Sequence, residues 1–434
     1  MNRTLIKYLQ TLIGQKVQIA GFVQSVRDQK RMQFVILRDH TGMIQLFHEK
    51  GGDEDTLKVA ISSLTQESAI IASGTLTSNQ NVKLGGVEIV LDSVDVASLA
   101  ETPIPITKES SLDLQLDWRT LSIRRPENNL IFRVQTTLEQ GMREYWDQEG
   151  FTEIHSPKLM GTASESGAEL FQLDYFGQKA SLAQSPQFYK QMAMAAGLDR
   201  IFEIGPVFRA NPSFTPRHDT EFTSVDVEIS WIKTHEDIMQ FEEAWLRYTI
   251  NKVAQIHGAE IKEMFGVDVV VPELPFPRIT LSKARHILAE RGRTIEDRAD
   301  LDPLGERDIT EYIQKQFGHE FVFVTDYPVE VRPFYHRRHE SDPTLTKSFD
   351  LLWKGLEITT GAQREHRVEI LTKQAIEKKI SLESIKYYID FFRYGCPPHG
   401  GFGLGLTRLL MILLDKKNVR EVTYLYRGPN RLTP

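Results

Sequence analysis

Cysteine and long apolar runs are almost absent from this chain of 434 residues. The single cysteine, Cys396, excludes an internal disulfide framework and a zinc site built on several thiolates. So little cysteine fits a reducing compartment, and we expect a cytoplasmic protein. The sequence holds no run of about 18 apolar residues, and residues 1–14 lack a sustained apolar stretch. We therefore expect neither a membrane span nor a signal peptide.

Positive charge is not in excess either. The formal net charge is −7, which argues against a protein that coats nucleic acid over its whole surface. The charges are unevenly placed, however. Residues 1–50 hold eight Lys and Arg against three Asp and Glu, whereas residues 51–100 hold two against seven. A basic N-terminal segment of this kind can bind phosphate groups locally.

A dinucleotide-binding fingerprint and internal repeats are also missing. Three glycines near the C-terminus, Gly401, Gly403 and Gly405, alternate too closely for G-x-G-x-x-G, and no long β-α-β pattern surrounds them. Their backbone can still lie flat against a planar or charged ligand, because no Cβ intrudes. Close packing of a helix on a sheet would explain the glycines equally well, but it would not explain Arg408 in the helix that follows.

What is present begins with an N-terminal region of short alternating strands. Five strands with Gly and Asp turns predict a small closed barrel of the OB type in residues 1–102. Such barrels stack nucleic-acid bases on exposed aromatic side chains. Phe34, near Arg27 and Gln33, is the candidate platform, although the pattern alone favours a core position for Phe34. The predicted strands are residues 17–27, 33–39, 42–47, 69–76 and 87–91.

The remaining chain predicts a second, larger domain of the α+β class. Residues 103–125 are polar and Pro-containing, which indicates a linker. Residues 128–149 have helical spacing and end at Gly150, and residues 151–157 alternate as a strand. We therefore expect a domain over residues 126–434, in which an antiparallel sheet is flanked by helices and residues 265–345 form an insertion.

A cationic loop lies between two predicted strands of this domain. Residues 208–222 contain Arg209, Arg217 and His218 in a short Pro-containing turn. Forked guanidinium groups match phosphate oxygens in pairs, so the loop suits a polyphosphate. The alternative interpretation is a surface hairpin with scattered charge.

Two acidic residues follow in a predicted strand pair at residues 347–364, which we expect to end in a Thr-Thr-Gly turn. Asp350 and Glu357 are seven positions apart, and a turn at Lys354-Gly355 would place both on one side of a hairpin. Two carboxylates together with nucleotide phosphates commonly hold Mg²⁺. Taken alone, the pair is equally well explained as ordinary surface charge.

Several of these segments together resemble one family. FRANPSFTPRHDTEF resembles motif 2 of class II aminoacyl-tRNA synthetases, GFGLGLTR resembles motif 3, and the helix and strand ending at Pro157 resemble motif 1. With AQSPQFYKQ, KSFDLLWKGLEITTGAQREHR and the terminal RLTP, the chain is most similar to archaeal-type aspartyl-tRNA synthetases. The resemblance covers essentially the whole chain, including the barrel.

The resemblance implies a function and a set of site residues. The enzyme would activate L-aspartate with ATP and Mg²⁺ and transfer it to tRNA(Asp). Arg209 and Arg408 would be the catalytic residues, and the barrel would bind the anticodon. The implied ATP-binding residues are Arg209, Asn211, Arg217, His218, Glu357, Gly405 and Arg408; the aspartate-binding residues are Glu165, Gln187, Lys190, Arg209, Thr360 and Arg364; the metal ligands are Asp350, Glu357 and Thr360; the anticodon-binding residues are Gln24, Arg27, Gln33 and Phe34.

Aspartate is preferred to asparagine as the substrate on physical grounds. Lys190 and Arg364 would place two cations at the substrate side chain, and a neutral amide would leave both unpaired. An asparaginyl-tRNA synthetase remains the alternative enzyme. A non-catalytic RNA-binding relative would be expected to lose at least one motif arginine or Glu357, and an ammonia-dependent asparagine synthetase would lack the barrel.

Two departures from the family pattern and one interface expectation complete the prediction. Motif 2 usually has Glu where this chain has Asn211, which puts one nucleotide contact in doubt. Archaeal enzymes that reject tRNA(Asn) tend to have Trp where this chain has Gln24, so we hypothesise that tRNA(Asn) is charged as well. Because motif 1 forms the two-fold interface in this family, we expect a homodimer.

Overall fold

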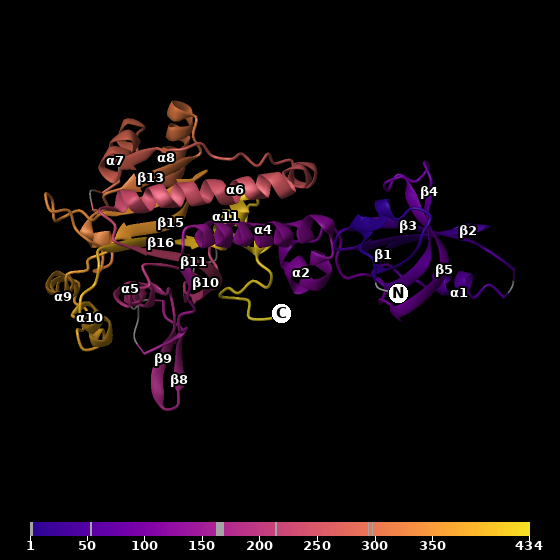
Figure 1. Ribbon diagram of the computed structural model, residues 1–434, viewed down its shortest axis with the longest axis horizontal. Helices are drawn as coiled ribbons and strands as arrows, with labels where there is room; N and C mark the ends of the chain where they lie inside the picture. The colour runs from indigo at the N-terminus through magenta and orange to yellow at the C-terminus, as the bar shows by residue number, and fades with distance from the viewer. Residues whose placement is uncertain (1–2, 53, 162–168, 213–214, 294, 297) are drawn as a thin grey trace. The chain divides into compact units, whose positions relative to one another are not determined.

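The computed structural model describes residues 3–434 apart from residues 53, 162–168, 213–214, 294 and 297 (Figure 1). The chain divides into two compact units, Met1–Asn129 and Leu130–Pro434. Two short helices, α2 (Leu112–Asp117) and α3 (Arg119–Ile123), occupy the segment that the sequence suggested as a linker. Arg124 follows them; its guanidinium stacks on Phe22 of the barrel at 3.9 Å.

The first unit is a closed five-stranded barrel, as predicted. Its strand order is β1-β2-β3-β5-β4, and the core consists of inward-pointing aliphatic side chains such as Val23, Val35 and Leu46. The alternation of these residues with polar ones gives each strand one buried face. The strands are β1 (Lys16–Asp28), β2 (Met32–Asp39), β3 (Gly42–Glu49), β4 (Ala69–Ser78) and β5 (Val87–Ser98); η1 (Ile6–Thr11) precedes them, and α1 (Thr56–Ser62) lies between β3 and β4.

The second unit is built on an eight-stranded sheet flanked by helices, which confirms the α+β prediction. The six central strands are antiparallel, but the two edge strands, β6 and β12, are each parallel to their neighbour, so the sheet is mixed. In spatial order the strands are β12 (Arg278–Thr280), β13 (Phe321–Thr325), β14 (Ser348–Trp353), β15 (Leu356–Gln363), β16 (His399–Gly405), β11 (Glu221–Ser230), β10 (Arg200–Phe208) and β6 (Thr152–Glu153). A separate small sheet contains β7 (Leu159–Met160), β9 (Gln178–Leu182) and β8 (Gln172–Tyr175).

Two local predictions were wrong. The strand expected over residues 151–157 is limited to Thr152–Glu153, because the Ser156 N–H and hydroxyl donate to the Glu203 carboxylate instead of to a strand. The expected Thr-Thr-Gly turn lies inside β15, and the hairpin turns at Lys354-Gly355. Both turn residues have positive φ, 48° and 85°, as a two-residue hairpin loop of type I′ requires.

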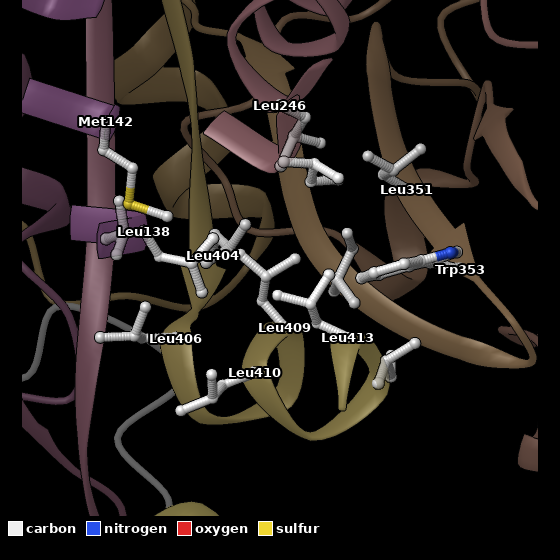
Figure 2. Close-up of a cluster of buried hydrophobic side chains, with 14 of the residues drawn as sticks. Leu138, Met142, Leu246, Leu351, Trp353, Leu404, Leu406, Leu409, Leu410 and Leu413 are labelled. Atoms are coloured by element: carbon white, nitrogen blue, oxygen red, sulfur yellow. The ribbon is translucent and has the colours of Figure 1, made fainter. Parts of the chain in front are cut away.

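Long helices cover one face of the large sheet. Helix α4 (Pro126–Gln148) lies antiparallel to α6 (His235–Phe265), and Trp146 stacks on Trp245 with ring centroids 5.2 Å apart. Figure 2 shows Leu138 and Met142 of α4 close to the leucines of β16 and α11 (Leu406–Leu413). The other helices are α5 (Gln187–Ala195), α7 (Leu281–Glu290), α8 (Pro303–Phe317), η2 (Val329–Val331), α9 (Val368–Glu377), α10 (Lys386–Phe392) and α12 (Val419–Val422).

Strand β11 shows how the sheet separates the core from a polar face. Val225, Val227 and Ile229 belong to the hydrophobic core, whereas Asp226 and Glu228 alternate with them. Successive side chains of a strand point to opposite faces. The sheet therefore presents buried carboxylates on the face opposite the core.

The Gly-rich segment is a central strand of the sheet. A Cβ on Gly401 would lie 1.9 Å from the Val227 carbonyl oxygen, and one on Gly400 would lie 2.7 Å from the Ala362 carbonyl oxygen. Contacts shorter than 3.0 Å to backbone atoms cannot be relieved by a side-chain rotation. Close approach between neighbouring strands thus requires glycine at these two positions.

We predict that Gly401→Ala lowers the free energy of unfolding by about 1–3 kcal/mol, because the new methyl group overpacks the sheet. The control is Gly258→Ala in the middle of α6, where a Cβ meets nothing within 4 Å. That substitution should raise the stability by up to about 1 kcal/mol, since Ala is the better helix former. Equal denaturation midpoints for the two variants would contradict the packing explanation.

Candidate functional site

A cavity of about 310 Å³ lies over the polar face of the large sheet. Its walls come from the loop between β10 and β11, from α5, β15 and β16, and from the first turn of α11. It brings together residues that are far apart in the sequence. The predicted ATP, substrate and metal residues that line it are Gln187, Lys190, Arg209, Asn211, Arg217, His218, Glu357, Thr360, Arg364, Gly405 and Arg408.

Two predicted residues are not among these lining residues. Glu165 lies outside the described residues. Asp350 is buried, and the guanidinium of Arg332, which itself lines the cavity, pairs with its carboxylate at 2.5 Å. Arg332 in turn stacks on Tyr327 at 3.7 Å. Arg332 pairs with Asp350 Oδ2 only, and Asp350 Oδ1 is buried without a hydrogen-bond partner among the described residues.

Three arginines converge around His218 at one end of the cavity. Burial, followed by the nearby charges of Arg408, Arg217 and Arg209, lowers the pKa of His218 below its usual 6.5. Arg217 lies 3.1 Å from the Glu306 carboxylate and Arg408 lies 3.7 Å from the Glu357 carboxylate, but cations gathered around one imidazole still favour a further anion. This end of the cavity therefore suits a highly charged anion such as a polyphosphate.

Glu357 connects this cationic end to the sheet. The Arg408 guanidinium donates to the Glu357 backbone oxygen at 3.1 Å, and the Thr360 hydroxyl donates to Glu357 Oε1 at 3.1 Å. Glu357 and Thr360 thus place two oxygen ligands side by side at the cavity. Among the described residues, no group of three His, Cys, Asp or Glu side chains is arranged to hold a metal ion by itself.

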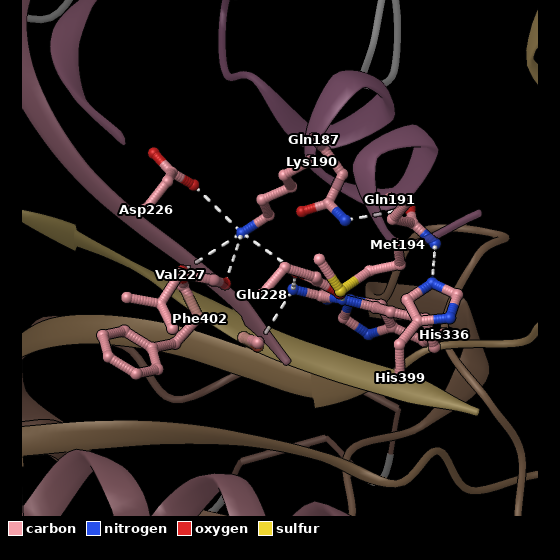
Figure 3. Close-up of polar contacts among 12 residues, drawn as sticks. Gln187, Lys190, Gln191, Met194, Asp226, Val227, Glu228, His336, His399 and Phe402 are labelled. Atoms are coloured by element: carbon pink, nitrogen blue, oxygen red, sulfur yellow. Dashed lines mark hydrogen bonds and ion pairs between the residues drawn. The ribbon is translucent and has the colours of Figure 1, made fainter. Parts of the chain in front are cut away.

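A buried ionic network forms the opposite end of the cavity (Figure 3). The Lys190 ammonium donates to Asp226 Oδ1 at 3.0 Å and to the Phe402 carbonyl oxygen at 3.1 Å, and it lies 3.4 Å from Glu228 Oε2. Lys190 reaches this point from α5, where Gln187 donates to Gln191 one turn further on. Only 1% of Lys190 is exposed, so these partners replace its hydration.

Arg364 completes the network from the end of β15. Its Nε donates to Glu228 Oε1 at 3.0 Å, and its two terminal nitrogens lie 3.0 Å from His336 Nε2 and 2.9 Å from the Gly401 carbonyl oxygen. Burial disfavours the charged carboxylate of Glu228, but Arg364 and Lys190 outweigh it and lower its pKa below 4.5. Burial and the neighbouring Arg364 also lower the pKa of His336, which keeps this imidazole neutral.

The two substrate-side cations are therefore not unpaired, contrary to the expectation from sequence. Lys190 and Arg364 are matched in number by Asp226 and Glu228 before any substrate binds. A neutral amide would not leave these cations without a counterion. The preference for aspartate over asparagine consequently cannot rest on unpaired charge at Lys190 and Arg364.

Asp226, Glu228 and Asp219 are among the carboxylates at the site that sequence reasoning missed. Asp226 and Glu228 alternate with apolar residues, a pattern typical of a strand with one solvent-exposed face. Residues 225–230 are in fact buried on both faces, and polar residues at such positions indicate buried partners. Asp219 lines the cavity beside Arg408, and burial raises its pKa to about 7 despite a hydrogen bond from Thr407. No spacing rule marks Asp219 in advance.

The barrel carries a half-exposed aromatic pair. Phe34 is paired across the strands with Arg27 on β1 and Phe47 on β3; the Arg27 guanidinium lies 4.9 Å from the Phe34 ring, and the two rings lie 5.5 Å apart. Phe34 is therefore not a core residue. Gln33 differs: it is 0% exposed, and its amide donates to Asp28, Ser62 and the Lys58 backbone. Gln24 is half-buried and accepts a hydrogen bond from Arg38.

The chain matches two known families, one over the barrel and one over the region that contains the large sheet. Residues 17–97 match the OB-fold nucleic acid binding domain, and residues 111–427 match tRNA synthetases class II (D, K and N). The second match covers well over half of the chain. The chain therefore belongs to the class II tRNA synthetases of the D, K and N group, which confirms the resemblance read from the motifs, and it is an AMP-forming aminoacyl-tRNA ligase.

Curated relatives match over nearly the whole length. An aspartate--tRNA(Asp/Asn) ligase from Aeropyrum pernix is 40% identical over 437 residues, which cover 99% of this chain and 98% of that protein. An aspartate--tRNA(Asp) ligase from Pyrococcus abyssi is 41% identical over 427 residues, which cover 98% and 97%. The relatives therefore agree on aspartate in their names but differ in the tRNAs named.

Solved structures with the same fold include both asparaginyl- and aspartyl-tRNA synthetases. The asparaginyl-tRNA synthetase from Pyrococcus horikoshii complexed with asparaginyl-adenylate superposes with a TM-score of 0.93 at 32% identity over 100% of both chains. The aspartyl-tRNA synthetase from Entamoeba histolytica gives a TM-score of 0.88 at 31% identity, over 100% of this chain and 93% of that one. The fold alone thus does not select the amino acid.

We predict that Glu228→Gln costs about 3–5 kcal/mol of unfolding free energy at pH 7, because it leaves Lys190 and Arg364 short of a buried counterion. Glu369→Gln, an exposed position on α9, is the control and should change stability by less than about 0.5 kcal/mol. Because the folded pKa of Glu228 is lowered, its contribution is present above the unfolded pKa near 4.5 and is lost as the pH falls. The difference in unfolding free energy between the wild type and Glu228→Gln should therefore become smaller as the pH falls. A difference that does not depend on pH would contradict the charge explanation.

Proposed function

We propose that the enzyme activates L-aspartate with ATP to aspartyl-adenylate and transfers the aspartyl group to the 3′ end of tRNA(Asp). The observation that carries this proposal is one cavity with a cluster of arginines at one end and a buried, charge-balanced pocket at the other. The arginine end fits the triphosphate, and the Lys190–Arg364 end fits a small polar amino acid. The aspartate specificity is supported by the names of the relatives at about 40% identity.

The first step requires alignment rather than proton transfer. The attacking carboxylate of the amino acid is already ionised at neutral pH, so no general base is needed. Arg209, at the mouth of the cavity beside Phe222, would contact the α-phosphate and the carboxylate. Arg408 would clamp the nucleotide from the other wall, and Arg217 and His218 would hold the outer phosphates. Fixed guanidinium groups can stabilise the charge that develops at the α-phosphorus.

Mg²⁺ would be held at Glu357 and Thr360. The carboxylate and hydroxyl oxygens that meet at the cavity are the hard ligands that this ion prefers, and the ATP phosphates supply further ligands. When bound, the ion neutralises phosphate charge. Asp350 would add a further ligand through Oδ1, which is buried without a hydrogen-bond partner in the described part of the chain, while its Oδ2 is paired with Arg332.

The barrel would bind the anticodon through Phe34 and Arg27. The half-exposed Phe34 ring offers a stacking face, and the neighbouring guanidinium offers a cation for the backbone or the base. Gln33 is buried and hydrogen-bonded within the barrel, so its contribution would be to hold the end of β2 in place. Gln24 would lie at the edge of this surface.

We further propose that tRNA(Asn) is charged with aspartate, because Gln24 stands where discriminating archaeal enzymes tend to have Trp. The half-buried amide of Gln24 leaves more room than an indole. A homodimer in the cytoplasm is the expected form of the enzyme. Strand β6, which follows α4 in motif 1, is an edge strand of the large sheet, and Leu159, a few residues further along the chain, is 48% exposed.

The amino acid and the tRNA breadth can be tested in one series. We predict that aspartate, and not asparagine, drives pyrophosphate exchange, and that both purified tRNA(Asp) and purified tRNA(Asn) accept aspartate. Arg209→Ala should abolish exchange while tRNA binding persists, which controls for contaminating activity. Exchange driven by asparagine would favour the asparaginyl enzyme instead. Failure to aspartylate tRNA(Asn) at high enzyme concentration would limit the activity to tRNA(Asp).

For the barrel, we predict that Phe34→Ala raises the KM for tRNA while exchange without tRNA is unchanged. Loss of one stacked base costs about 1–3 kcal/mol, which corresponds to an increase of roughly 5- to 150-fold. Tyr8→Ala is the control, because Tyr8 is a 55%-exposed aromatic residue of the same unit outside this surface. If exchange fell as much as charging in Phe34→Ala, Phe34 would be acting through the fold.

A further inference from the structure

Helix α8 contributes a carboxylate to the phosphate end of the cavity. Glu306 lies in its first turns, and its Oε2 accepts a hydrogen bond from the Arg217 guanidinium at 3.1 Å. This helix belongs to residues 265–345, the part of the catalytic unit to which no site residue was assigned from sequence. Arg217 lines the cavity in the loop between β10 and β11.

The environment of Glu306 is unfavourable for a carboxylate. Only 9% of Glu306 is exposed, and the neighbouring acids Glu357 and Asp350 add to the effect of burial, which raises its pKa to about 7 although Arg217 and Arg408 oppose the shift. A buried carboxylate next to other carboxylates costs stability unless a cation compensates it. Its pairing with Arg217 is thus the feature that explains a glutamate at this place.

Glu306 is not needed to begin the helix. Asp302 occupies the N-cap position, and its Oδ1 accepts a hydrogen bond from the Gly305 backbone at 2.7 Å. Pro303 at the first helical position has no N–H that needs a partner. The carboxylate of Glu306 is therefore directed to Arg217 rather than to the helix terminus.

We propose that Glu306 is a positioning residue, which holds the Arg217 guanidinium at the cavity so that it is in place when the triphosphate binds. The inference rests on the proposed ATP-binding role of Arg217. A long side chain that is already immobilised loses less conformational freedom when it binds phosphate. This role of Glu306 would also involve residues 265–345 in nucleotide binding.

The test compares Mg-ATP with a ligand that lacks the outer phosphates. We expect Glu306→Met to raise the Kd for Mg-ATP, measured by calorimetry without amino acid, by roughly 3- to 10-fold. The Kd for a non-hydrolysable aspartyl-adenylate analogue should stay within about twofold of that of the wild type, because this ligand has no β- or γ-phosphate for Arg217 to contact. Glu306→Gln keeps an acceptor and should recover part of the ATP affinity.

Two further variants make the outcome decisive. Asp308→Asn removes another carboxylate of the same helix, one that pairs with Arg293 at 2.9 Å, and should leave both affinities unchanged. In an Arg217→Ala background, Glu306→Met should have no further effect on ATP binding, since the two residues act as one unit. Weaker binding of both ligands by Glu306→Met, or an additive effect with Arg217→Ala, would overturn the positioning role. Because the ATP measurement involves no amino acid, its result can be interpreted even if the assignment of aspartate is wrong. A wild type that binds Mg-ATP but not the aspartyl-adenylate analogue would contradict that assignment, and a wild type that does not bind Mg-ATP would contradict the proposed function itself.

Discussion

Four buried charges on the polar face of the sheet set the conditions for the rest of the site. Lys190 and Arg364 are matched with Asp226 and Glu228, and the chain holds all four away from water. Such a network is stable only when every member is satisfied. The position of α5 against β11 and the close approach of β16 are consequently constrained by the same contacts that shape this part of the cavity.

The two ends of the cavity differ in how firmly their cations are held. At the end proposed for the amino acid the cations, Lys190 and Arg364, are fully buried, and backbone oxygens and carboxylates fix them in place. At the phosphate end Arg209 is exposed, and Arg217 and Arg408 are only partly buried. A rigid pocket suits the discrimination of a small substrate, while less buried cations can adjust to a flexible triphosphate and to its metal.

Much of this architecture can be read from the sequence, because alternation and turn chemistry are local. The barrel, the long helix α4, the hairpin turning at Lys354-Gly355 and the cationic loop all follow from short-range patterns. The partners of the buried charges cannot be predicted from such short-range patterns. Nothing local pairs Asp350 with Arg332 or Lys190 with Asp226, since these contacts depend on strand order in space. The burial of Gln33 could not be predicted for a similar reason: one step along a strand moves a side chain from the outer face to the inside.

The glycines of β16 have a consequence for how such chains are recognised across evolution. Gly400 and Gly401 are required by the approach of neighbouring strands, whatever the ligand in the cavity. A descendant that had lost catalysis but kept the fold would therefore retain this part of the motif, whereas the arginines would be free to drift. The glycine pattern therefore indicates common ancestry, and only the charged residues beside it indicate that catalysis has been retained.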